Sequence, residues 1–266
     1  MEIPSLSSHD NPLVRTIRLV ATQARRAAAD LVLAEGIRVL EEATSAGCPL
    51  EAVLVDQDFG SSQREKELLL AWSRKRVPVR RATPALLRKL SDVLSPQGAL
   101  ALVRVPLHTL ATVRMVADPL ILCLCGIQDP GNLGTLLRTA RATQVSWVGS
   151  LKGTVSARNP KAIRASAGAF FSLAVVEDLS AAEIIDHCRA RRIRIIRAAP
   201  QRGRSCWEVD FRGPAAILLG NEAHGVDDEA WRGIPGVRIP MAAGAVLLFE
   251  ALRQRCKPPA HEAKGT

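Results

Sequence analysis

Residues 120–140 read Leu-Ile-Leu-Cys-Leu-Cys-Gly-Ile-Gln-Asp-Pro-Gly-Asn-Leu-Gly-Thr-Leu-Leu-Arg-Thr-Ala, and this stretch decides the fold. Its first part, residues 120–126, is apolar without polar alternation, which is typical of a parallel strand covered on both faces. The chain then turns at Pro130 and Gly131 and continues with helical spacing. The stretch therefore predicts a buried strand, a tight turn and a helix.

The same pattern recurs through the second half of the chain. Further apolar runs lie at Val145–Val148, Leu173–Val176, Ile193–Arg197 and Ala215–Leu219, with helical segments between them. Strands that alternate with helices in this way form parallel sheets. We therefore predict a parallel α/β domain over residues 117–256, followed by a flexible tail at residues 257–266.

A smaller α/β unit precedes this domain. Residues 31–104 alternate short apolar runs with helical stretches, and the periodicity lapses between Pro106 and Pro119. Residues 5–26 place apolar side chains at helical spacing opposite several arginines, which predicts a basic amphipathic helix. We predict that residues 1–106 form the first domain.

The chain is basic, which favours a polyanionic partner. Its 266 residues contain 36 Lys and Arg against 26 Asp and Glu, a formal charge of +10. Both halves carry the excess, so both could face a polyanion; a charge that serves only solubility is the alternative. Aromatic residues make up 3%, which argues against an aromatic platform for stacking bases. We expect cationic contacts instead, from Arg15, Arg25 and Arg26 of the first helix.

The cysteines and the apolar runs limit where the protein works. Six cysteines are scattered without a Cys-x-x-Cys pair or a neighbouring histidine cluster, so we expect neither zinc nor disulfides. No apolar run reaches the length of a membrane span, and residues 1–12 lack the apolar core of a signal peptide. We therefore expect a cytoplasmic protein without a metal.

The turn after residues 120–126 is the first candidate ligand site. Gly131 and Gly134 would let backbone amides approach an anion, Asn132 is a candidate N-cap, and Arg138 follows on the helix. The alternative is an ordinary strand-to-helix loop that uses glycine for turn geometry. The spacing matches neither the dinucleotide fingerprint nor the phosphate loop of NTPases, so nucleotide hydrolysis is not supported.

Two later stretches carry further candidates. Lys161 and Arg164 lie one helical turn apart and predict a compact cationic spot that could bind an anionic partner, with a solvated helix face as the alternative. Residues 220–225 follow the run at Ala215–Leu219, where α/β proteins usually hold ligands. Glu222 in this stretch is a candidate acid, base or hydrogen-bond acceptor.

Together these stretches resemble the SpoU/TrmH branch of the SPOUT superfamily, the AdoMet-dependent RNA 2′-O-ribose methyltransferases. Residues 129–134 with Arg138 are similar to the first motif of that family, residues 220–225 to its second, and residues 238–241 to the opening of its third; residues 159–166 are similar to a segment between them. Residues 34–36 and 95–98 look like its substrate-binding domain, which is related in fold to ribosomal protein L30e.

The resemblance implies an architecture and a set of residue roles. It implies a small L30e-like α/β domain before a SPOUT-type catalytic domain, a homodimer, and a C-terminal trefoil knot that forms the cofactor pocket. The expected AdoMet-binding residues are Leu219, Gly220, Asn221, Gly225, Ile239, Pro240 and Met241, and the expected catalytic residues are Asn132, Arg138 and Glu222. Because a guanidinium is a poor base, Arg138 is expected to orient a phosphate and stabilise the developing alkoxide. The L30e-like domain favours ribosomal RNA over transfer RNA.

The third motif departs from the family after Met241. The Ser-Leu-Asn element is absent, and roughly ten residues of the knot loop are missing, which argues against a complete knot. The alternative to an active methyltransferase is therefore an RNA-binding relative that has lost the AdoMet site. A third hypothesis is a metabolic α/β enzyme with a small anionic substrate, which would show no salt-dependent RNA binding.

Overall fold

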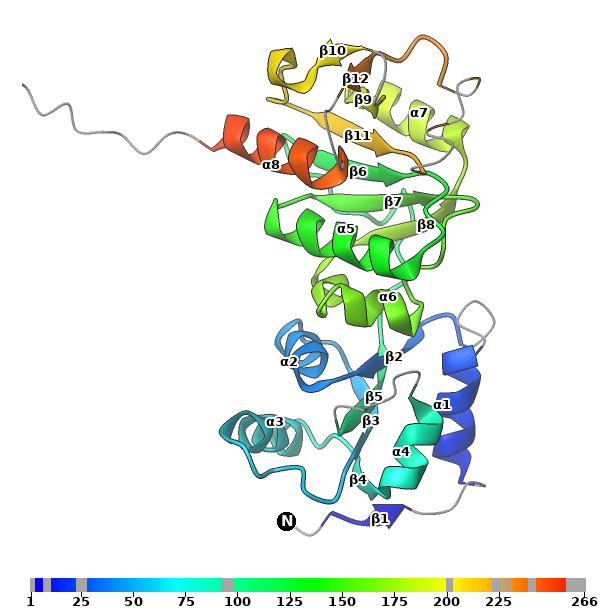
Figure 1. Ribbon diagram of the computed structural model, residues 1–266, viewed down its shortest axis with the longest axis vertical. Coiled ribbons are helices and arrows are strands. Elements are labelled where there is room, and N and C mark those ends of the chain that lie inside the picture. The colour runs from blue at the N-terminus through cyan, green and yellow to red at the C-terminus, as the bar shows by residue number, and fades with distance from the viewer. Residues whose placement is uncertain are drawn as a thin grey trace, which may run out of the picture.

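The computed structural model describes residues 3–6, 11–22, 28–91, 98–199, 203–221, 226, 229, 231–238 and 243–256. These residues form two β-sheets, one above the other, each with helices on both faces (Figure 1). None of the described helices combines the length and the apolar character that a membrane crossing requires.

The lower sheet belongs to the first part of the chain. Its described elements are β1 (Ser5–Leu6), α1 (Pro12–Thr22), β2 (Leu31–Glu35), α2 (Ile37–Ser45), β3 (Leu50–Val55), α3 (Gln63–Arg74), β4 (Val79–Ala82), α4 (Pro84–Leu90) and β5 (Ala99–Arg104). The strand order is β1-β4-β3-β5-β2, so β2 is an edge strand. Only the β1–β4 and β3–β4 pairs among these strands are parallel.

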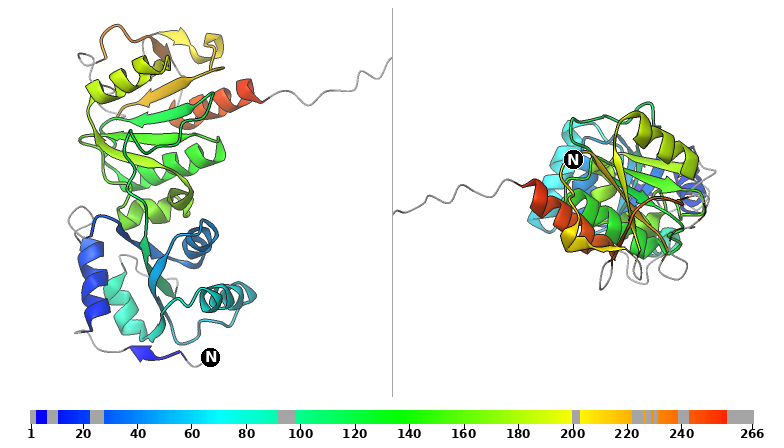
Figure 2. Two further views of the ribbon diagram at one scale, coloured as in Figure 1. Left: turned by 180° about the vertical axis from the view of Figure 1, so that it is seen from behind. Right: turned by 90° about the horizontal axis from the view of Figure 1, so that it is seen from above.

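The alternation of side chains along β5 explains how helices cover both faces of this sheet. Leu100 and Leu102 pack with the apolar residues of α1 and α4, whereas Ala101 and Val103 pack with those of α2 and α3. Successive residues of a strand point to opposite faces, so one strand serves both layers. Figure 2 shows the two helix pairs on opposite sides of the sheet.

The first helix begins later than predicted. It begins at Pro12, where the Asn11 side chain accepts a hydrogen bond from the Leu13 N–H at 2.9 Å, and it ends at Thr22. The residues at Ser5–Leu6 form β1 instead, because they pair with β4. The predicted helix over residues 5–26 is therefore wrong at its start. Arg15 is exposed on α1, as expected.

The upper sheet confirms the predicted parallel α/β domain. Its described elements are β6 (Leu120–Leu124), α5 (Pro130–Ala142), β7 (Trp147–Leu151), α6 (Pro160–Ala165), η1 (Ala169–Ser172), β8 (Val175–Leu179), α7 (Ala181–Ala190), β9 (Arg194–Ala198), β10 (Arg204–Ser205), η2 (Cys206–Glu208), β11 (Ala215–Leu219), β12 (Gly236–Arg238) and α8 (Ala243–Arg255). Every strand pair among the described residues of this sheet is parallel. The strands β7 and β8 begin two residues later than the apolar runs predict.

Helices cover the two faces of the upper sheet unequally. The helices α5 and α8 pack on one face, where Leu122 of β6 belongs to the same apolar cluster as Leu137 and Leu247. The other face carries α7, where Ile121 of β6 meets Ile184. This double cover explains why the strands of this sheet are apolar without alternation.

The strand order β10-β12-β9-β11-β6-β7-β8 contains a topological switch point. From β6 the chain moves outward to β7 and β8, and it then crosses to β9 and returns to place β11 directly beside β6. In such sheets ligands bind outside the carboxyl ends of the strands where the order reverses. The carboxyl ends of β6 and β11 therefore mark the expected ligand site.

Candidate functional site

The loop that leaves β6 is fixed by hydrogen bonds from neighbouring strand ends. The Cys125 N–H donates to the Leu219 carbonyl at 2.8 Å. The Thr154 hydroxyl accepts from the Gly126 N–H at 3.0 Å and donates to the Leu124 carbonyl at 3.1 Å. Gly126 has φ +68°, in the left-handed region that glycine adopts without steric cost. The switch point is therefore a rigid frame built from backbone groups and the Thr154 hydroxyl.

Asn221 joins the second predicted motif to the first. Its side-chain amide donates to the Gly126 carbonyl at 3.0 Å, directly beyond the end of β11. Of the other predicted cofactor residues, Leu219 is buried at the end of β11 and Gly220 follows it. The structure thus brings these three residues to the switch point, and it shows that Asn221 also ties the two motif loops together.

The start of α5 differs from the prediction. Asp129, not Asn132, is the N-cap, because its carboxylate accepts the Asn132 N–H at 2.8 Å and Pro130 begins the helix. A Cβ on Gly131 would lie 2.9 Å from the same carboxylate. Asn132 itself is exposed in the first turn of α5.

The second glycine of the motif serves helix packing and not a ligand. A Cβ on Gly134 would lie 2.5 Å from the Ala162 carbonyl oxygen and 2.5 Å from the Ala165 Cβ, both on α6. Gly134 is buried, so the prediction that it lets backbone approach a ligand is wrong for this residue. Its small size instead allows α5 to contact α6 closely.

The two predicted catalytic residues of α5 are both exposed. Six positions separate Asn132 from Arg138, which corresponds to about 9 Å along the helix axis and about 120° around it. The helix therefore does not by itself place their side chains together. Within the described part of the chain, no carboxylate forms an ion pair with Arg138.

The predicted cationic spot on α6 divides into two different environments. Lys161 is exposed at the start of the helix. Arg164 instead points to the lower sheet, where its Nη1 lies 2.8 Å from the Glu35 carboxylate, and its side chain is only 25% exposed. Because Arg164 pairs with Glu35, the structure does not place its guanidinium beside Lys161 on one exposed face, and RNA binding by the two residues stays a prediction.

Sequence reasoning missed the residue that anchors the loop between β7 and α6. Glu177 of β8 accepts hydrogen bonds from the Ser156 hydroxyl at 2.9 Å, the Ala157 N–H at 2.7 Å and the Arg158 Nε at 3.0 Å. These partners lie 19 to 21 positions before Glu177 in the sequence, and no local pattern signals the contact. Glu177 therefore fixes the loop between β7 and α6.

Several predicted residues lie outside the described residues. They are Arg25, Arg26, Glu222, Gly225, Ile239, Pro240 and Met241. The predicted absence of a complete knot concerns the same third motif, so it stays a prediction.

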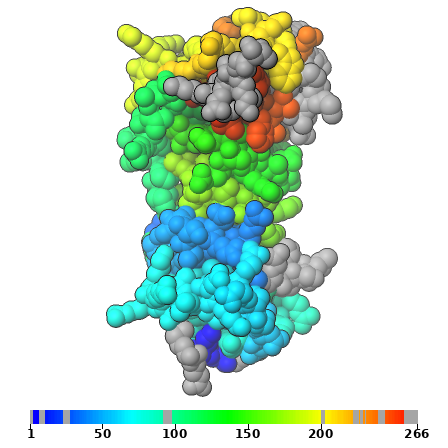
Figure 3. Space-filling model, turned by 90° about the vertical axis from the view of Figure 1, so that its left-hand side faces the viewer, coloured from blue at the N-terminus to red at the C-terminus, as the bar shows by residue number. Residues whose placement is uncertain are grey.

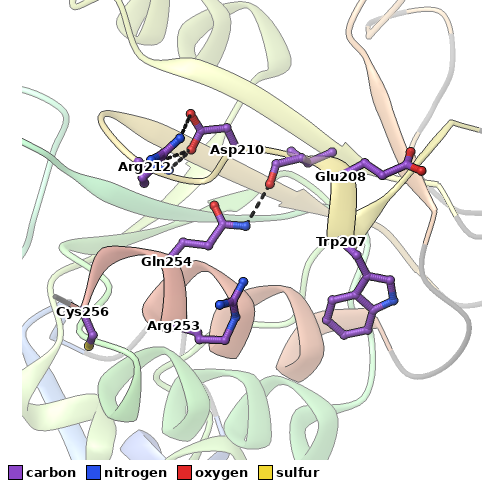
Figure 4. A pocket seen from close by; sticks show the side chains of 8 residues that line it. Trp207, Glu208, Asp210, Arg212, Arg253, Gln254 and Cys256 are labelled. Atoms are coloured by element: carbon purple, nitrogen blue, oxygen red, sulfur yellow. Dashed lines mark hydrogen bonds and ion pairs between the residues drawn. The ribbon is translucent and has the colours of Figure 1, made fainter. Parts of the chain in front are cut away.

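A pocket of 420 Å³ lies at the opposite end of the upper sheet, beside the last turn of α8 (Figure 4). Its lining residues are Trp207, Glu208, Val209, Asp210, Arg212, Arg253, Gln254 and Cys256. Arg255 of the same turn donates to the carbonyls of Asp118 and Gly213, which precede β6 and β11. The pocket is therefore at the amino ends of the strands, and we do not assign it to the cofactor.

Two family models match successive ranges of the chain. The model of the SpoU rRNA Methylase family matches residues 119–246, and the MRM3-like substrate binding domain matches residues 11–101. An uncharacterized tRNA/rRNA methyltransferase from Synechocystis sp. is 30% identical over 96% of this chain and 95% of its own length. The chain belongs to the SpoU rRNA methylase family.

Two further relatives of this SpoU methylase carry more specific names. The 23S rRNA (guanosine(2553)-2′-O)-methyltransferase RlmP from Bacillus subtilis is 28% identical over 84% of each chain. The solved structure of the SpoU methyltransferase AviRb from Streptomyces viridochromogenes, in complex with the cofactor AdoMet, has a TM-score of 0.79 and 28% identity over 92% of this chain and 98% of its own. The family consists of AdoMet-dependent RNA 2′-O-methyltransferases.

Proposed function

We propose that this SpoU methylase transfers the methyl group of AdoMet to a ribose 2′-hydroxyl of 23S ribosomal RNA. One observation carries the proposal: the two motif loops, after β6 and after β11, meet at the topological switch point and are joined there by the bond from Asn221 to Gly126. The names of the relatives from Bacillus and Streptomyces support AdoMet as donor and 23S rRNA as substrate class.

The described residues of the switch point fit the adenosine part of AdoMet. Gly126 and Gly220 carry no side chain over the strand ends, and the apolar side chain of Leu219, the last residue of β11, is 4% exposed and packs in the core cluster of the upper sheet. Gly244 at the start of α8 approaches Leu219 so closely that a Cβ on it would lie 2.9 Å from Leu219 Cδ1. An apolar floor with backbone groups at its rim suits a purine ring. We assign Leu219, Gly220 and Asn221 to this floor and rim.

The protein's task in the reaction is to align the acceptor and to stabilise its charge. When bound, AdoMet supplies an activated methyl group on a sulfonium. In-line displacement requires the 2′-oxygen to be held on the axis of the breaking bond, which is a matter of orientation. Arg138 orients the phosphate next to the target ribose and stabilises the alkoxide as its proton leaves. Asn132 holds the ribose, and Glu222 accepts the proton or orients Arg138.

The exposed cations supply the RNA contacts. We call the lower sheet with its helices the lower part, and the upper sheet with its helices the upper part. Arg15 is exposed on α1 of the lower part, and Lys161 is exposed on α6 of the upper part. RNA that touches both residues would span the lower sheet and the switch point. Binding of this kind weakens steeply as salt rises, because phosphate contacts release counterions. Together with Arg25 and Arg26, these residues form the RNA-binding set that we propose.

We also infer a homodimer that forms through α8 and works in the cytoplasm. Leu247 and Leu248 of α8 are buried against its own sheet, yet Phe249 on the other side is 53% exposed and Trp207 of η2 is 61% exposed. Two large aromatic side chains exposed near each other suit a partner surface, so we place the contact between two copies of the chain here. Figure 3 shows α8, in orange and red, next to the yellow residues of β10 and η2 on one face of the molecule.

Calorimetric titration with AdoMet tests the proposal first. Saturable one-site binding is expected, followed by transfer of radiolabelled methyl groups to 23S rRNA, with the modified position located by mass spectrometry. An S-adenosylhomocysteine titration serves as a control for the same pocket. A folded protein that binds RNA in a salt-dependent way but shows no AdoMet binding would refute the proposal and support the RNA-binding relative without a cofactor site.

A further inference from the structure

The edge strand of the lower sheet is docked on the segment that contains α6. An edge strand exposes unpaired backbone groups, which proteins cover or protect. Here β2 is the edge strand, and α6 lies between the two sheets (Figure 1). The apolar cluster runs on without interruption from Val32 and Ala34 of β2 to Ile163 of α6 and Phe170 of η1. The two parts of the protein thus share one core at this junction.

Two arginines of the upper part hold the two ends of β2. Arg158 donates through Nη1 to the Ala29 carbonyl at 2.6 Å, just before the strand. Arg164 donates through Nη1 to the Glu35 carboxylate at 2.8 Å, at its last residue. Because Arg158 is itself bound by Glu177 and is only 12% exposed, its guanidinium is fixed from both sides. β2 is therefore secured at both ends.

Glu35 is the centre of the second attachment. Its carboxylate is 4% exposed, and it accepts a hydrogen bond from the Ser91 hydroxyl at the end of α4 in addition to the bond from Arg164. A buried carboxylate is costly unless its oxygens are paired. Glu35 thus links β2, α4 and α6, which belong to both parts of the chain.

A glycine of the upper part lies in close contact with a helix of the lower part at this junction. Gly168 has φ +87°, and a Cβ on it would lie 2.6 Å from Glu42 Cβ and 3.3 Å from Val39 Cα, both on α2. The helix α2 therefore contacts the turn after α6 directly. On its other side α6 contacts α5 through Gly134, and α5 carries Arg138. Rigid contacts lead from the lower sheet to the proposed catalytic arginine.

We propose that Glu35, Arg158 and Arg164 are positioning residues that select the methylated nucleotide by holding the RNA-docking part at a fixed distance from the switch point. The inference rests on the proposed function. RNA bound to the lower part would present only the ribose that reaches Arg138 across this fixed span. Loosening the junction would let neighbouring riboses reach the same position.

The test compares Arg164→Met with Arg164→Lys, which keeps a cation for Glu35. For Arg164→Met we expect unchanged AdoMet affinity, a fall in kcat/KM for RNA of about tenfold or more, and methyl groups on nucleotides next to the wild-type position. We expect Arg164→Lys to restore the position and most of the rate. Arg189→Met is the matched control, since it removes an ion pair to Asp186 whose side chains are 76% and 72% exposed.

Two independent readouts separate the possible failures. Small-angle X-ray scattering of Arg164→Met, and of Glu35→Gln in case the first variant does not fold, should show a larger radius of gyration than the wild type. Unchanged scattering of a folded variant, or a loss of rate with no spread of the methylated position, would overturn the inference. A wild-type protein that fails to methylate RNA would refute the proposed function instead, whatever the scattering shows.

Discussion

Replacing Gly134 with alanine tests the contact between α5 and α6 directly. Two effects oppose each other. Alanine in a helix interior is favoured over glycine by about 1 kcal/mol. The added Cβ would lie 2.5 Å from the Ala162 carbonyl oxygen, 2.5 Å from the Ala165 Cβ and 2.8 Å from the Ser166 nitrogen. To reach an ordinary contact of 3.4 Å, the helices must separate by about 0.9 Å, which is 3.4 minus 2.5.

The steric effect should dominate, because two of these three atoms are backbone and cannot rotate away. Overpacking of this kind costs about 1–3 kcal/mol, and the close contacts put Gly134→Ala at the upper end. We expect a net loss of about 2 kcal/mol of unfolding free energy, or about 4–8 °C in Tm for a protein of this size. Urea unfolding followed by tryptophan fluorescence measures it, with an unchanged slope against urea.

Gly131→Ala is the matched control in the same helix. Its Cβ would meet only the Asp129 carboxylate, at 2.9 Å, and that side chain can move. We expect a change within about 1 kcal/mol, the usual value of an N-cap. If Gly134→Ala proved as stable as Gly131→Ala, the contact between α5 and α6 would not be the constraint that we infer, and the rigid connection from the lower sheet to Arg138 would lose its main support.

Three further predictions concern single side chains. Arg138→Ala should lower kcat for RNA methylation at least about a hundredfold while AdoMet affinity by calorimetry stays unchanged; an equal loss of AdoMet affinity would contradict its role toward the ribose. Asp129→Ala should cost about 1 kcal/mol of stability in thermal unfolding, and an unaffected Tm would mean that the cap at α5 is dispensable. Burial lowers the pKa of His187, with a smaller contribution from nearby Arg191, and burial and Arg158 do the same for His108. The folded state therefore keeps these rings neutral, so stability is complete above the unfolded pKa near 6.5 and falls as the pH drops below it; His187→Gln should flatten this dependence in urea titrations at pH 7 and below.

Much of the fold follows from local pattern, and the exceptions have physical causes. The run Ala215–Leu219 coincides with β11 because it is buried on both faces, so every residue carries the signal. β7 extends to Leu151. The apolar run ends at Val148 because Gly149 and Ser150 are small or polar, so the pattern does not predict the second half of the strand. These residues are in a strand because they pair with β6 on one side and β8 on the other, which the local sequence does not reveal.

The candidate site shows the same division between local and distant causes. The N-cap of α5 was within reach of sequence reasoning, since Pro130 at the first helical position marks Asp129 as the residue before it. The partner of Arg164 was not, because Glu35 lies 129 positions earlier and belongs to another sheet. A cation at helical spacing looks the same whether it faces solvent or a buried carboxylate. The packing role of Gly134 is hidden in the same way.

The uninterrupted apolar cluster between the two parts also bears on how the chain folds during synthesis. The lower sheet is complete once β5 has been made, but the residues that cover β2 and α2 extend to Leu173. At ordinary translation rates the nascent chain needs roughly 3–14 s to make this stretch of about 70 residues. During that interval the newly formed lower sheet would expose an apolar edge. Ribosome-associated chaperones bind surfaces of this kind. The first part of this protein should therefore be a transient chaperone client until its second part emerges.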